Sequence, residues 1–162
     1  MLKLERFVFD SVPPELARLL EAATMPSLTA GPKNDDLRDW LQNHGANLPE
    51  LQPLAKSALW LVSGDLDASH EISQSVATAD GSFWHGIMHR REGDFWNAKY
   101  WFRRVGRHPV LTKLAKTDYR DPQSFVDRCE AAPAFGDTEL EACKTIQWLE
   151  WQLLFKHCLD SE

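Results

Sequence analysis

Apolar residues recur along most of the chain with the three- and four-residue spacing of amphipathic helices. The opening patch, KLERFVF, is the one segment that favours an extended strand. Pro13 and Pro14 predict the start of a helix. Residues 25–34 are rich in Pro, Gly and small polar side chains, which indicates a loop. Further helices are expected over about 34–45, 49–64, 65–79, 82–92, 94–105, 110–116, 121–131 and 138–159. The pattern predicts an all-α fold.

The last predicted helix, 138–159, carries apolar residues on more than one face, so we expect it to lie at the centre of the fold. Thr138 followed by Glu141 has the spacing of a capping box at its start. The three cysteines form no Cys-x-x-Cys pair, and an odd number in a chain of this length favours buried thiols over a disulfide framework.

The middle of the chain contains an internal repeat at an offset of 29 residues. The strings GDLDASHEISQSV (64–76) and GDFWNAKYWFRRV (93–105) align without a gap. Upstream of these strings, Leu54 aligns with Phe83 at the same offset. Each unit predicts two helices joined by a Gly-Asp turn, in which glycine permits the turn and aspartate caps the second helix.

The second copy of this repeat has a pattern that extends to a closing proline: Gly93, Asp94, Phe95, Ala98, Phe102, Val105 and Pro109. This pattern resembles the second half of a tetratricopeptide repeat, in which a small residue lets two helices approach closely. The resemblance covers about residues 50–109 and implies helical hairpins there. Two copies are fewer than the roughly three that a free-standing array needs, so the fold implied is a compact multi-helix bundle in which flanking helices close the hairpins.

Length and composition indicate one helical domain over residues 1–162, typical of a soluble globular protein at 43% hydrophobic and 26% charged residues. Its parts are an N-terminal patch, helix and loop (1–33), the repeated hairpins (50–109) and the long C-terminal helix (138–159). No window reaches the roughly 18 uninterrupted apolar residues of a membrane span, and the charged N-terminus does not read as a secretory signal. We expect a cytoplasmic protein with no membrane partner.

The chain has a net charge of −6, yet residues 85–108 contain six Lys and Arg against two acids. This contrast favours a site for a small anionic molecule or a protein partner on the hairpin over 82–108. The residues expected to form it are Trp84, Arg90, Arg91, Asn97, Lys99, Trp101, Arg103 and Arg104. Alternatively, the basic residues pair with acids of neighbouring helices. Nucleic acid is not expected as a partner, because the overall charge is acidic and no recognised motif is present.

Histidines offer a second class of function. His85, His89 and Glu92 are spaced i, i+4 and i+7, which places them on one face of a helix, and His70 lies on the preceding helix of the repeat. Two or three imidazoles brought together could bind zinc, iron, manganese or nickel, with Glu92 as a further ligand or as the general base of a metal-dependent enzyme. Otherwise, each ring hydrogen-bonds to its neighbours. Convergence of the three histidines would favour the metalloprotein over the binding domain.

Overall fold

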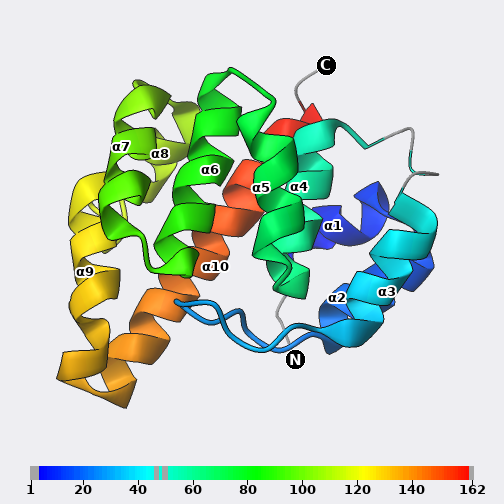
Figure 1. The fold of residues 1–162 in the computed structure, drawn as a ribbon, viewed down its shortest axis with the longest axis horizontal. Helices are drawn as coiled ribbons and strands as arrows, with labels where there is room; N and C mark the ends of the chain where they lie inside the picture. Colours follow the sequence, from blue (N-terminus) through cyan, green and yellow to red (C-terminus); the bar gives the residue numbers. More distant parts are fainter. Residues whose placement is uncertain (1–3, 46–47, 49–50, 161–162) are drawn as a thin grey trace.

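The computed structural model describes residues 4–45, 48 and 51–160, and within these ranges the chain forms ten helices and no strand (Figure 1). The all-α prediction is therefore confirmed. The helices are α1 (Arg6–Ser11), α2 (Pro14–Ala22), α3 (Asp35–His44), α4 (Pro53–Ser63), α5 (Leu66–Gln74), α6 (Ala79–Glu92), α7 (Phe95–Val105), α8 (Pro109–Leu114), α9 (Pro122–Phe135) and α10 (Asp137–Asp160).

The expected N-terminal strand is wrong from Arg6 onward, because these residues form α1. Val8 is fully buried, and α1 packs against α2 and α10. The backbone N–H of Glu5 donates to Oε1 of Gln152 at 2.9 Å. A short apolar run satisfies its backbone groups internally as a helix, whereas a lone strand has no neighbour to pair with. Lys3, the first residue of the patch, lies outside the described residues.

Several helix boundaries differ from the sequence expectation. The helix expected to reach Ala79 ends at Gln74, and Ala79 instead begins α6, where the Thr78 side chain accepts a hydrogen bond from the Gly81 N–H at 3.1 Å. Pro49, the expected start of the fourth helix, lies outside the described residues; α4 begins at Pro53. The capping box is also wrong, because α10 begins at Asp137, one residue before Thr138.

The 29-residue repeat is visible as two hairpins with matching turns, α4–α5 and α6–α7. Gly64 and Gly93 end their helices in the left-handed region at φ 81° and 89°, a conformation that favours glycine. Asp65 and Asp94 cap the next helices by accepting hydrogen bonds from backbone N–H groups three residues later. The two hairpins are therefore built alike, and they lie side by side in chain order from α4 to α7 (Figure 1).

The buried apolar side chains form one contiguous cluster that α10 crosses, as its apolar pattern predicts. Arg90 of α6 is fully buried in this core, and its guanidinium bonds both carboxylate oxygens of Glu150 on α10, at 2.5 and 3.2 Å. The Tyr119 hydroxyl donates to the same carboxylate at 2.9 Å. This network ties α6 to α10. None of the helices in the described ranges combines the length and the apolar character needed to cross a membrane.

Candidate metal centre

His70 of α5 and His85 and His89 of α6 come together where these two helices pack against each other. One ligand atom of each ring lies within 4.8 Å of the other two. The ring centroids are 4.6 Å apart for His70 and His85, 5.4 Å for His70 and His89, and 4.8 Å for the stacked pair His85 and His89. The i, i+4 spacing on α6 sets the stacked pair, and the repeat places α5 beside it. The structure thus brings together the three histidines singled out from the sequence.

Glu92 fixes the orientation of one of these rings. Its carboxylate Oε2 lies 2.9 Å from Nδ1 of His89, one turn earlier on the same helix. Because an ionised carboxylate only accepts hydrogen bonds, Nδ1 of His89 is the donor, which in a neutral imidazole leaves the lone pair on Nε2. A carboxylate bonded to the far nitrogen of a histidine is the arrangement that commonly supports a metal ligand. Glu92 is therefore placed to orient a ligand through hydrogen bonding.

His85 is the buried member of the cluster, with 3% of its surface exposed. Its Nδ1 is buried and has no hydrogen-bond partner in the described part of the chain. Burial, and then the charges of His89 and His70, lower the pKa of His85 to about 3. The ring is consequently neutral near pH 7, the protonation state in which an imidazole ligates a metal. An unpartnered buried nitrogen destabilises a fold unless something fills the gap.

Trp101 of α7 contacts the histidine cluster and also lines a pocket, which none of the three histidines borders. The Trp101 ring stacks on His85 with centroids 3.9 Å apart and an interplanar angle of 12°. The same Trp101 borders a pocket of about 460 Å³, whose other lining residues are Ser73, Gln74, Val76, Ala77, Thr78, Ala79, Ser82 and Arg104. The guanidinium carbon of Arg104 is 5.4 Å from the Trp101 ring centroid. Trp101 and Arg104 are thus the two members of the expected anion site that share a pocket.

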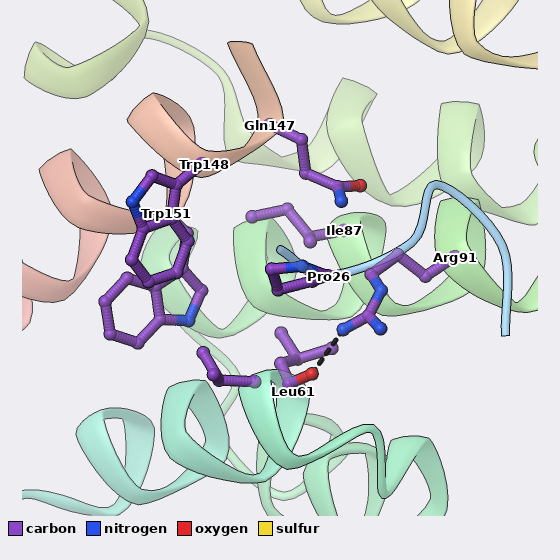
Figure 2. A pocket seen from close by; sticks show the side chains of 8 residues that line it. Pro26, Leu61, Ile87, Arg91, Gln147, Trp148 and Trp151 are labelled. Carbon is purple, nitrogen blue, oxygen red and sulfur yellow. Dashed lines mark hydrogen bonds between the residues drawn. The ribbon is translucent and has the colours of Figure 1, made fainter. Parts of the chain in front are cut away.

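Three other members of that expected site, Trp84, Arg90 and Arg91, are buried and point into the core rather than into a site shared with Arg104. Arg90 is bonded to Glu150, and the indole N–H of Trp84 lies 3.3 Å from Sγ of Cys158. Arg91 donates from Nε to the carbonyl of Ser27 at 3.1 Å and from Nη1 to the carbonyl of Leu61. Figure 2 shows Arg91 beside Pro26, Leu61 and Gln147 around a cavity of about 10 Å³, room for about one water molecule.

The remaining members lie on the outer side of α7 and do not converge. Lys99 forms an ion pair with Asp127 of α9, and Asn97 donates to the Asp94 carboxylate at 3.1 Å. Arg103 is exposed and does not line the pocket. The alternative weighed from the sequence, that basic residues pair with acids of neighbouring helices, therefore holds for Arg90 and Lys99.

A second histidine cluster, which the sequence did not reveal, joins Asp80 of α6, His108 and His157 of α10. Oδ1 of Asp80 lies 2.6 Å from Nε2 of His108 and 3.3 Å from Nε2 of His157. The backbone N–H of Val110 donates to Nδ1 of His108 at 3.2 Å, so His108 caps α8; its ring is buried. Its hydrogen bond to Asp80 is the main cause that lowers the pKa of this carboxyl. Because Asp80, His108 and His157 lie far apart in the sequence, no local sequence pattern predicts that they meet.

The chemistry open to the first cluster is metal ligation. Imidazoles are donors that zinc and its neighbours in the first transition row accept. The function has to be inferred from this geometry. The chain matches no family model, and no curated protein or solved structure is significantly similar to it.

Proposed function

We propose that the protein binds a divalent transition-metal ion through His70, His85 and His89. The observation that carries the proposal is the convergence of three histidine ligand atoms within 4.8 Å, one ring having a buried nitrogen without a partner. A tetrahedral ion with bonds of about 2.0–2.1 Å holds its nitrogen ligands about 3.3 Å apart. The proposal therefore includes side-chain rotations that bring the three nitrogens closer together when the metal binds.

Zinc is the metal that this donor set suits best, with iron, nickel and manganese as less favoured alternatives. Three neutral imidazoles match sites in which three protein ligands leave a fourth position open for water or substrate. The pocket at Trp101 supports such an open position. Glu92, bonded to His89, holds the ring in the tautomer that ligates through Nε2. This arrangement favours a metal that acts on a ligand over a metal that only stabilises the fold.

Two broader features belong to the same proposal. The paired hairpins with matching Gly-Asp turns support a distant relation in architecture to tetratricopeptide repeats, here closed into a bundle by α10. The thiols of Cys129, Cys143 and Cys158 are all buried and unpaired, which supports a location in the cytoplasm.

The direct test is metal content measured by mass spectrometry on untagged protein purified without chelator and incubated with zinc. We expect about one equivalent of zinc per chain in the wild type and in His44→Ala, a matched control at an exposed position of α3. The double variant His85→Ala, His89→Ala is expected to bind none. His70 is less buried than the other two histidines, so His70→Gln should lose zinc while the protein stays folded. Circular dichroism reports whether each variant is folded, and so separates loss of the ligand from loss of the fold. Equal zinc in a folded double variant would overturn the proposal.

A further inference from the structure

We infer that the pocket beside the three histidines binds a short carboxylic acid that carries a second oxygen-bearing group. Its carboxylate pairs with Arg104, and its other end reaches the metal. This inference rests on the proposed metal centre and names the class of ligand that the centre takes. It follows from the charge of the pocket, the position of Arg104 and the stack that links Arg104 to His85.

The pocket lining selects for negative charge. Among its nine lining residues, Arg104 is the one charged side chain, and no aspartate or glutamate is present. A cationic group that meets no carboxylate in its own pocket attracts an anion from solution. The volume of about 460 Å³ lies within the range of roughly 300–1,000 Å³ that small-molecule sites occupy.

Arg104 differs from the other basic residues of the hairpin. Arg90 and Lys99 form ion pairs with Glu150 and Asp127, whereas within the described residues Arg104 forms no ion pair. It instead lies over the rings of Tyr100 and Trp101, with its guanidinium carbon 5.7 and 5.4 Å from their centroids. These cation–π contacts hold the guanidinium beside the pocket, and its N–H groups other than the one bonded to the Tyr100 hydroxyl stay available for a planar carboxylate.

Trp101 sets the distance between the anion and the metal. Its ring contacts His85 at 3.9 Å and Arg104 at 5.4 Å. The guanidinium carbon therefore lies no farther from the His85 ring centroid than the sum of these two distances. A ligand that spans this gap has a short carbon chain with polar groups at both ends, as in a four-carbon dicarboxylate.

The charge of the pocket matches a carboxylate better than a phosphate. The Ser73 hydroxyl donates to the carbonyl of His70 at 3.3 Å, and the Thr78 hydroxyl oxygen accepts from Gly81. The hydroxyls of Thr78 and Ser82 can still donate to a ligand, but Arg104 is the one positive charge among the lining residues. A phosphate carries a charge of about −1.5 to −2, which one guanidinium does not neutralise, whereas a carboxylate group carries a single negative charge.

The experiment is a calorimetric titration of zinc-loaded protein with succinate, butyrate and inorganic phosphate. Butyrate has the same number of carbons as succinate but one carboxylate. We expect succinate to bind about tenfold more tightly than butyrate, and phosphate to bind more weakly than succinate. Arg104→Gln is expected to weaken succinate binding about tenfold, since it removes a charge-assisted pair. Arg103→Gln, the exposed neighbour outside the pocket, serves as the matched control and is expected to bind succinate as the wild type does.

Zinc content, measured first on the same samples, separates the two proposals. If all variants hold zinc but succinate binds Arg104→Gln as it binds the wild type, the ligand class is refuted while the metal centre stands. Phosphate binding more tightly than succinate would likewise overturn the carboxylate assignment. A wild-type protein that takes up no zinc would refute the metal centre and, with it, this inference.

Discussion

The two ends of α6 carry two histidine clusters that look alike by distance and differ in hydrogen bonding. Near its start, Asp80 meets His108 and His157; farther along, His85 and His89 meet His70. In each cluster the candidate ligand atoms lie within 4.8 Å of one another. Both ring nitrogens of His108 have protein partners, whereas the buried Nδ1 of His85 has none. Proximity alone therefore does not make a metal site; an available lone pair does.

The position of the proton on His108 explains why the Asp80 cluster differs from the His70 cluster. Because the Val110 N–H donates to Nδ1, that nitrogen carries no proton, and the single proton of the neutral ring is on Nε2, directed at Asp80. A metal at Nε2 would displace this proton and leave the ring with none. The Asp80 cluster thus links α6, α8 and α10 by hydrogen bonds, whereas the His70 cluster offers nitrogen ligands to a metal.

The largest effect is expected from His85→Leu, which removes the unpartnered nitrogen and one proposed ligand together. Zinc binding should be lost, while the zinc-free protein should be as stable as the wild type or slightly more stable, since a buried polar atom without a partner destabilises the fold. Chemical unfolding with and without zinc measures both effects. A large loss of stability in the zinc-free variant would show that His85 is a structural residue.

His108→Ala is expected to lower the stability of the fold and to leave zinc binding unchanged. This change removes the cap of α8, worth about 1 kcal/mol, and a hydrogen bond to a charged group, worth about 1.5–3 kcal/mol. The free energy of unfolding should fall by about 2–4 kcal/mol in urea titrations, with zinc content unchanged in the folded protein. Loss of zinc from folded His108→Ala would mean that the two clusters are not independent.

A smaller effect is expected from Glu92→Gln, which weakens the hydrogen bond that orients His89. Changes to the partner of a metal ligand typically reduce affinity by about 10–100-fold. We expect a reduction of this order in zinc affinity from competition with a chromophoric chelator, and little change in stability, since Glu92 is exposed. Glu130→Gln, the same change at an exposed glutamate of α9, is the control and should bind zinc as the wild type does.

The two clusters should also respond to acid in different pH windows. The pKa of His85 falls from 6.5 to about 3 on folding, so between these values the unfolded chain binds more protons and the zinc-free protein loses stability as the pH falls. The pKa of Asp80 is lowered from 3.8, so its stabilising contribution is present above that value and is lost as the pH falls through the folded value. His85→Leu should flatten the first window of the stability profile and Asp80→Asn the second. Unchanged profiles would contradict these assignments.

The sequence predicted those features that depend on local pattern. The all-helical class, the Gly-Asp turns at Gly64 and Gly93 and the common face of His85 and His89 follow from glycine conformation and helical periodicity. The approach of His70 follows from the repeat, which places α5 beside α6.

The features that the sequence missed depend on packing. Every residue of α6 from Gly81 to Arg91 is buried, so a helical wheel has no solvent side from which to decide where Arg90 and Arg91 point. Both guanidiniums turn inward because Glu150 and the carbonyls of Ser27 and Leu61 receive them. The contacts of Asp80 with His108 and His157 require α8 and α10 to be packed against α6, which no local pattern encodes.

Diffraction from crystals grown with zinc, recorded at the zinc absorption edge, tests the difference between the two clusters most directly. We expect one anomalous peak per chain, bonded to nitrogens of His70, His85 and His89, with Oε2 of Glu92 still hydrogen-bonded to Nδ1 of His89. A peak between Asp80, His108 and His157, or no peak at either cluster, would contradict this expectation.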